Sequence, residues 1–116
     1  MNNYDLENRL IAFSVDIIKI VNHMVNSKAG NHLAGQIVRS GTSGSLNYGE
    51  TQGTESRKDF IHKMKIILKE LREKYICLKI IGLAELFKDT SKLNNLINEN
   101  NQLIAIFVNS LQTAKK

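Results

Sequence analysis

The segment HLAGQIVRSGTSGSLNYGETQG, residues 32–53, decides the fold of this chain. It holds five of the seven glycines, and each interior glycine costs a helix about 1 kcal/mol relative to alanine. Composition alone therefore favours a loop, although a 20-residue loop is rare in a small domain. Periodicity decides between the two, because polar and small residues each recur there at steps of three and four. We predict a helix over residues 32–53.

Polar side chains form one face of this predicted helix. They are Gln36, Arg39, Ser43, Asn47 and Glu50. The other side carries small and apolar residues, which let a neighbouring helix approach closely. The polar face is either a ligand site or a buried hydrogen-bond network. We favour the network, in which Arg39, Glu50 and Arg57 supply one another's partners, because buried charges need pairing.

Three further helices are predicted from apolar residues at three- and four-residue steps, over about 5–26, 56–81 and 90–113. Asp5 and Ser56 are candidate N-caps, and Asp89, Thr90 and Ser91 are alternative caps for the last helix. The last helix carries Asn100 inside its apolar stripe, where a polar residue is more often a register-fixing residue or a solvated gap than a site. The chain has no proline to interrupt these helices. Short connections predict an all-α fold, an antiparallel up-down four-helix bundle in one domain, residues 1–116.

Composition indicates the cellular compartment of the protein. The chain has 116 residues, a net charge of +5 and one cysteine, which indicates a reducing compartment. Its longest apolar run, Leu103–Val108, is too short for a membrane span. The first residues lack the basic and apolar regions of a signal peptide. We therefore expect a cytoplasmic protein without membrane contact.

The charge excess lies in residues 56–88, which hold nine basic and four acidic residues. On the predicted third helix the cations follow one line and include a histidine. The members of this row are Lys58, His62, Lys65, Lys69, Arg72 and Lys79. A row of this kind fits a phosphate backbone, whose counterions each cation would displace. A solvated helix face is the alternative interpretation.

A second set of residues exceeds what one bundle core needs, because its members lie off the core stripes. They are Ile11, Ile18, Val25, Ile66, Ile76, Cys77 and Ile80. Exposed in a monomer, they would form a costly apolar patch. We predict that a symmetric homo-oligomer buries them; a wider intramolecular core is the alternative.

Signals for catalysis are weak. Gly41-Thr42-Ser43-Gly44 matches neither a nucleophile elbow nor a phosphate-binding loop. Asp59 and His62 have metal-ligand spacing on a helix, but the second such motif of a di-metal bundle is missing. We expect no enzyme activity, no catalytic residue, no metal and no cofactor.

Three blocks of sequence carry a family resemblance. They are Gln36–Ser43 (QIVRSGTS), Asn47–Glu50 (NYGE) and Glu55–Lys63 (ESRKDFIHK). With them the chain resembles the bacterial four-helix bundle proteins encoded in intervening sequences of 23S ribosomal RNA genes. It is also similar to the accessory variability determinant of diversity-generating retroelements. The resemblance implies a ring-like pentamer of bundles. The retroelement relative binds nucleic acid and a reverse transcriptase through a basic surface, and the intervening-sequence members are associated with binding of ribosomal RNA.

Two functions follow from the sequence. The leading hypothesis is a non-enzymatic homo-oligomer that binds RNA or DNA weakly through the basic row on the third helix. The alternative is a protein-interaction scaffold or accessory subunit, whose apolar surfaces bind another protein and which has no direct contact with nucleic acid. Salt dependence separates them, since phosphate contacts weaken steeply as salt rises.

Overall fold

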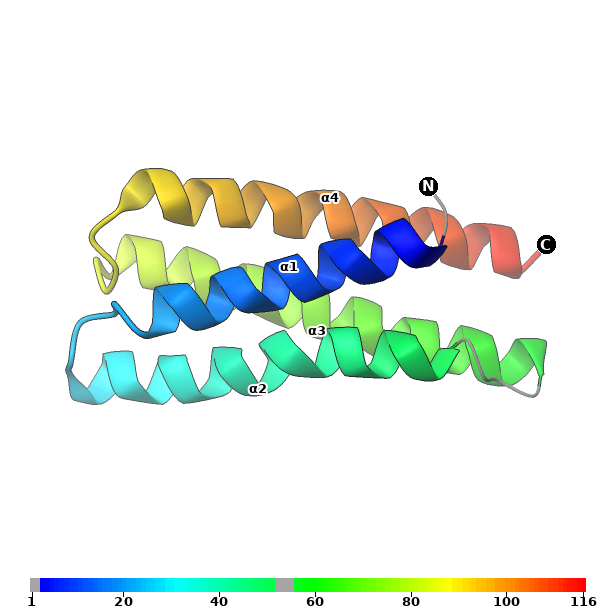
Figure 1. Ribbon diagram of the computed structural model, residues 1–116, viewed down its shortest axis with the longest axis horizontal. Coiled ribbons are helices and arrows are strands. Elements are labelled where there is room, and N and C mark those ends of the chain that lie inside the picture. Colours follow the sequence, from blue (N-terminus) through cyan, green and yellow to red (C-terminus); the bar gives the residue numbers. More distant parts are fainter. Residues whose placement is uncertain (1–2, 52–55) are drawn as a thin grey trace.

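The apolar spacing of the sequence produces four long helices (Figure 1). The computed structural model describes residues 3–51 and 56–116. In these residues the helices are α1 (Asn3–Val21), α2 (Lys28–Thr51), α3 (Arg57–Leu83) and α4 (Thr90–Ala114), and there is no strand. Successive helices run in opposite directions, so the predicted up-down four-helix bundle is confirmed. The bundle measures 45 × 22 × 20 Å.

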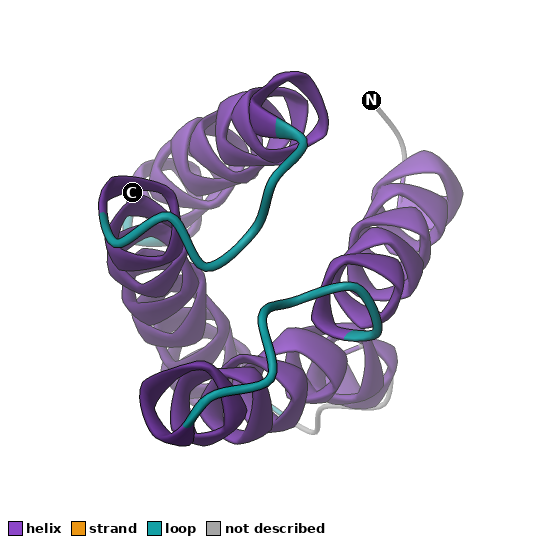
Figure 2. Cartoon of the chain, turned by 90° about the vertical axis from the view of Figure 1, so that its left-hand side faces the viewer, coloured by secondary structure: helices purple, strands orange, loops and turns teal. Residues whose placement is uncertain are grey.

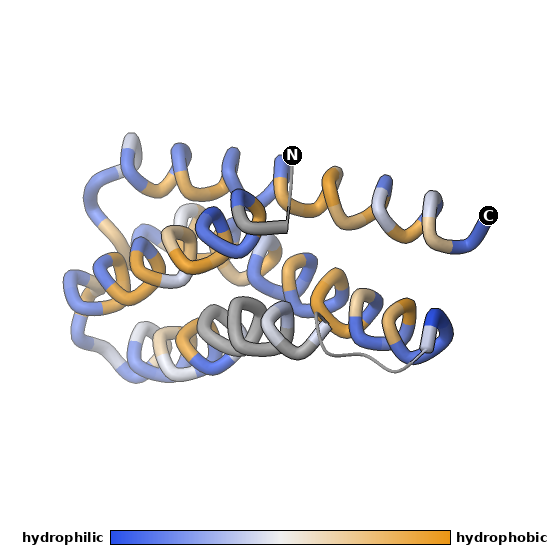
Figure 3. Tube along the Cα trace, turned by 45° about the vertical axis from the view of Figure 1, so that its right-hand side comes forward, coloured by the Kyte–Doolittle hydropathy of each residue, from blue (hydrophilic) through white to orange (hydrophobic). Residues whose placement is uncertain are grey.

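The helices stand at four corners, with α1 diagonal to α3 and α2 diagonal to α4 (Figure 2). Hydrophobic and hydrophilic residues alternate in short stretches along the parts of the helices that Figure 3 colours by hydropathy. The predicted apolar stripes meet inside, where Leu10, Ile17, Leu71 and Phe107 are almost completely buried. Burying each such side chain stabilises the fold by about 1.5–3 kcal/mol.

The glycine- and serine-rich segment is helical throughout its described length, as its periodicity predicts. Among its described side chains, Ile37 and Tyr48 are the large apolar ones that are buried. Tyr48 reaches across the bundle and packs edge-on against Phe107, with ring centroids 5.9 Å apart. The expected close approach of a neighbouring helix is not found at Gly35 or Gly49, because a Cβ added to either residue would meet nothing within 4 Å.

Asn100 of α4 is completely buried, within the apolar stripe where the sequence places it. Its Nδ2 donates a hydrogen bond to the backbone oxygen of Leu71, at 3.0 Å. This cross-helix bond ties α4 to α3 at one level. It supports the prediction that Asn100 fixes the register of the two helices.

The helix boundaries differ from the prediction at one end of the bundle. α1 ends at Val21 and not near Asn26, and α2 already begins at Lys28 and not at His32. The reason is a contact between distant loops, because the Val25 amide donates to the Leu86 carbonyl at 2.8 Å. That bond draws the chain out of the helix. Ser27 Oγ then accepts from the Gly30 amide, as an N-cap does.

The caps of α3 and α4 follow the sequence. Ser56 and Asp89 each accept a bond at 3.1 Å, from the amides of Asp59 and Lys92. Asp5 is not the cap of α1 but lies in its first turn. α3 continues through Gly82 to Leu83, and Glu85 then reverses the chain with a φ of 57°. The amide of Leu86 bonds back to Ile81, which closes the end of α3.

Gly30 gives a test of the loop contact. A Cβ at this position would lie 2.3 Å from the Val25 carbonyl oxygen, which belongs to the backbone of the residue that Leu86 holds. We expect Gly30→Ala to lower the free energy of unfolding by about 1–3 kcal/mol. The measurement is urea denaturation followed by circular dichroism.

Gly35→Ala is the matched control for this experiment. Gly35 is a helical glycine of α2, and a Cβ added to it would meet nothing within 4 Å. Alanine there should raise stability by up to about 1 kcal/mol, because it favours the helix. Equal effects of the two substitutions would show that the Val25–Leu86 contact does not fix this end of the bundle.

Candidate nucleic-acid interface

The predicted basic row lies on the surface of α3. Ser56 sets the first residue of the helix, and this fixes the direction of each later side chain. All six predicted residues are exposed: Lys58, His62, Lys65, Lys69, Arg72 and Lys79. Steps of seven residues place Lys58, Lys65, Arg72 and Lys79 about 10 Å apart along the axis. The row therefore presents charge over most of the helix length.

Part of the row borders a groove between α3 and α4. The groove has a volume of about 540 Å³, with the buried side chains of Leu68 and Leu111 at its base. Its cations are Lys65, Lys69 and Arg72 from α3 and Lys115 from the end of α4. Glu73 and Ile76 also line it. Lys58, His62 and Lys79 lie on α3 outside this lining, so the row and the groove overlap only in part.

Lys115 is a groove residue that sequence reasoning missed. It belongs to no periodic pattern of α4, and only the antiparallel packing of α4 on α3 brings it near Lys65. Arg57 holds this end of α4, because its guanidinium donates to the backbone oxygens of Ala114 and Lys116. The bond to Lys116 is 2.8 Å long. Arg57 thus positions the Lys115 turn, a contact that the predicted network with Arg39 and Glu50 did not include.

The predicted polar face of α2 is partly exposed. Gln36 and Arg39 are exposed and line a second groove of about 560 Å³, together with Glu70, Glu73 and Cys77 of α3. The side chains of Ser43, Asn47 and Glu50 lie outside the described residues. At Gln36 and Arg39 the face is therefore an accessible mixed-charge surface and not a buried network.

Lys74 is the residue that sequence reasoning missed most clearly. It lies in the core with 1% of its surface exposed, and its Nζ sits 5.3 Å from the centre of the Phe13 ring. Burial lowers the pKa of Lys74 to about 8, and the charge of Glu70 partly offsets this. The signal was present, because position 74 stands three residues after Leu71 and four before Leu78, on the core stripe. Lys74 therefore belongs to the interior and not to the basic surface.

The apolar residues predicted for an oligomer interface are exposed in the single chain. Ile11, Ile18, Val25, Ile66, Ile76 and Ile80 have between 37% and 57% of their surface exposed. Val15 and Leu83 belong with them, and Leu83 is 84% exposed. Cys77 is half-buried, and burial raises the pKa of its thiol, which makes it a poor nucleophile. A wider intramolecular core is thus wrong for the six aliphatic residues.

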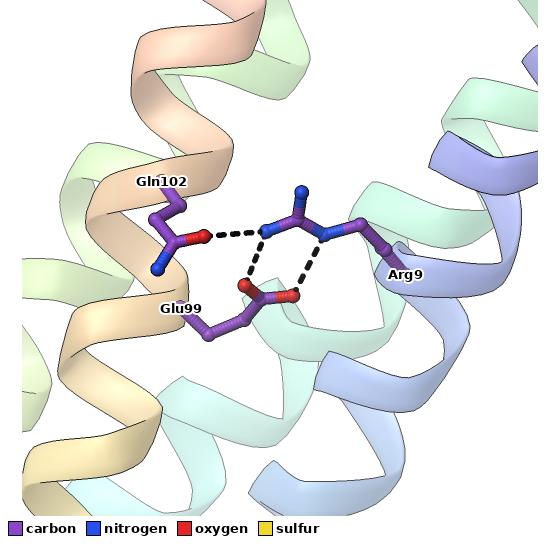
Figure 4. Close-up of polar contacts among 3 residues, drawn as sticks. All are labelled: Arg9, Glu99 and Gln102. Carbon is purple, nitrogen blue, oxygen red and sulfur yellow. Dashed lines mark hydrogen bonds and ion pairs between the residues drawn. The ribbon is translucent and has the colours of Figure 1, made fainter. Parts of the chain in front are cut away.

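The seam between α1 and α4 is held by a polar clasp (Figure 4). Arg9 of α1 donates to both carboxylate oxygens of Glu99, at 3.1 and 2.5 Å, and to the Gln102 side chain at 3.1 Å. The bonds to Glu99 raise the pKa of Arg9. Because the clasp is partly exposed, we assign it a role in aligning α1 with α4. Its contribution to the free energy of unfolding is small.

These features define a helical bundle with a basic groove and exposed apolar surfaces. A family model described as 23S rRNA-intervening sequence protein matches residues 2–109, and the chain belongs to that family. A crystal structure of a protein of unknown function from the S23 ribosomal protein family, from Bacteroides thetaiotaomicron VPI-5482, is similar. It has a TM-score of 0.85 and 26% identity, over 97% of this chain and 99% of that one. No curated protein matches the chain.

Two other features concern the part of the chain that the structure describes. No helix there is both long and apolar enough to cross a membrane. Within residues 3–51 and 56–116, no three residues among His, Cys, Asp and Glu are grouped so that they could hold a metal ion.

Lys74 gives a prediction of pH dependence. Its pKa is lower in the folded chain than the 10.5 of a free lysine, so its burial cost is fully present below pH 8 and disappears as pH rises to 10.5. Lys74→Met should therefore raise the free energy of unfolding at pH 7, by about 1–3 kcal/mol. By pH 10 the gain should shrink. Urea denaturation of both proteins across pH 7–10 measures it.

Lys65→Met is the control, since Lys65 is an exposed lysine of the same helix. Its effect on stability should stay small and constant over this pH range. If Lys74→Met destabilised the bundle equally at pH 7 and pH 10, this result would contradict the assigned burial cost of the Lys74 charge.

Proposed function

We propose that this protein is a non-enzymatic, cytoplasmic homo-oligomer that binds RNA or DNA through backbone phosphates. The observation that carries the proposal is the groove in which Lys65, Lys69 and Arg72 of α3 meet Lys115 of α4. Four cations around one concave surface attract a polyanion, and Glu73 is the acidic residue among its lining residues. Membership in a family named for 23S ribosomal RNA intervening sequences supports an RNA ligand.

The binding should be weak for one chain and stronger for the assembly. One groove offers only a few phosphate contacts, and these give affinities that fall steeply with salt. Several copies in one particle multiply the contacts without any change in the groove. The family resemblance implies a pentamer, and the exposed isoleucines of α1 and α3 supply the surfaces that an oligomer would bury.

Charge reversal in the groove tests the proposal. The triple variant Lys65→Glu, Lys69→Glu, Lys115→Glu should lose retention on RNA, because it replaces three attractive contacts of the groove by repulsive ones. For the milder triple alanine variant, the slope of log K against log salt should fall by about 2–3. Fluorescence anisotropy with a labelled RNA from 50 to 300 mM salt gives both results.

The matched control is Lys28→Glu, Lys88→Glu, Lys92→Glu, which has the same charge change at exposed positions away from the groove. It should keep most of the binding. Light scattering checks that both variants keep the native particle mass. Unchanged, salt-sensitive binding by the groove variant would refute the assignment.

Single alanine substitutions distinguish RNA binding in the groove from RNA binding along the basic row of α3. Lys115 lines the groove but is not on the row, whereas Lys79 is on the row but not in the lining. We expect Lys115→Ala to weaken RNA binding and to lower the salt slope by about 1. Lys79→Ala should weaken RNA binding less and should lower the salt slope less. The reverse order, in the same anisotropy titration, would show that phosphates follow the row along α3 and not the groove.

A protein-interaction scaffold is the second candidate function. The observation that favours it is the exposed apolar end of α3, where Ile76, Ile80 and Leu83 are 44–84% exposed. If the protein is such a scaffold, the wild-type chain shows no salt-dependent RNA binding. The anisotropy titration therefore distinguishes the two candidates.

A further inference from the structure

Two exposed apolar stripes of the chain share one pattern. On α1 the residues Glu7, Ile11, Val15 and Ile18 follow one another at steps of four, four and three. On α3 the residues Arg72, Ile76, Ile80 and Leu83 follow at the same steps. Each stripe begins with a charge and continues with three aliphatic side chains that are 40–84% exposed. The leading charges are opposite in sign.

The stripes lie on different sides of the bundle. α1 and α3 occupy diagonal corners and make no direct helix pairing, so their outer faces point away from each other. They also run in the same direction, since each is antiparallel to α2. One chain therefore cannot bring its own two stripes together, but two copies can.

Building on the proposed homo-oligomer, we propose that the α1 stripe of one copy packs in parallel against the α3 stripe of the next. In this alignment Glu7 meets Arg72, and Ile11, Val15 and Ile18 meet Ile76, Ile80 and Leu83. Charge supports the pairing over the whole helices, because α1 has a net charge of −1 and α3, without the buried Lys74, of +4. The contact covers residues that would otherwise remain exposed apolar surface.

Pairing of like stripes is less favourable. A two-fold axis across the bundle would set two α1 helices antiparallel, so that Glu7 of each copy faced Ile18 of the other. The same operation on α3 would place Arg72 against Leu83. Both arrangements bury a charge against an aliphatic side chain, whereas the unlike pairing gives each charge a partner.

The unlike, parallel contact determines the kind of particle. Each copy uses two different surfaces, so the contacts repeat head to tail and form a ring if the rotation closes. Because the paired helices are parallel, all bundles point the same way. The N-terminal halves of α3, with Lys58, Lys65 and Lys69, then gather at one end of the ring. A phosphate chain could contact several copies there.

Disulfide cross-linking tests which stripes meet. In a Cys77→Ala background, chains with Ile11→Cys are mixed with chains with Ile76→Cys and oxidised with copper phenanthroline. We expect covalent dimers from this mixture, and also from Ile18→Cys with Leu83→Cys. Chains with Ile11→Cys alone should stay single on a denaturing gel. Dimers from Ile11→Cys alone, or from Ile11→Cys with Leu83→Cys in preference, would overturn the parallel unlike contact.

Charge exchange tests the leading pair of the stripes. Glu7→Arg and Arg72→Glu should each shift the particle toward the 13.1 kDa of one chain, and the double exchange should restore the larger mass, as measured by native mass spectrometry. Failure of the double variant to restore it would count against the Glu7–Arg72 contact. A wild-type mass of one chain would refute the homo-oligomer itself, whereas a larger mass without the expected cross-links would refute only this pairing.

Discussion

The position of α3 between α2 and α4 is the constraint on which the other features depend. α3 packs along both neighbours, and its inner face supplies six of the buried apolar residues of the core. The inner face is fixed in turn by the Ser56 cap at its start and by the Asn100–Leu71 hydrogen bond in its middle. With the cap and this hydrogen bond in place, α3 cannot rotate about its axis. The helical periodicity then determines the direction of its outer cations and isoleucines.

This rigidity explains how much the sequence could reveal. The four helices were predictable because apolar steps of three and four report which face is buried, even in the glycine-rich stretch of α2. The Ser56 cap was predictable because its geometry is local, and Asp89 was one of three candidates for the cap of α4. The end of α1 at Val21 was not, since it depends on a bond between Val25 and Leu86, 61 residues away. Contacts of that range leave no mark in local spacing.

The basic residues show the same difference between features set by local spacing and features set by contacts between distant parts of the chain. The row on α3 could be read from the sequence, because its members lie on one helix. Lys115 enters only through the packing of α4, and Arg57 takes part only by binding the end of that helix. Lys74 shows the reverse error: a charge counted with the basic segment is buried against Phe13. Composition assigns charge to a segment, but only packing decides which charges reach solvent.

The outer face of α3 is divided along its length, and the division makes the two proposed roles compatible. Most of its exposed cations lie between Lys58 and Arg72, where Ile66 is also exposed, and its most exposed aliphatic residues lie between Ile76 and Leu83, where Lys79 is the remaining member of the basic row. A polyanion on the first part leaves the second part free for a neighbouring chain. Arg72 stands at the boundary, where it lines the groove and also begins the apolar stripe. Its guanidinium has five donors, enough to bind a carboxylate and a phosphate together. Assembly and polyanion binding would therefore meet at one residue, so that each could strengthen the other by fixing the same side chain.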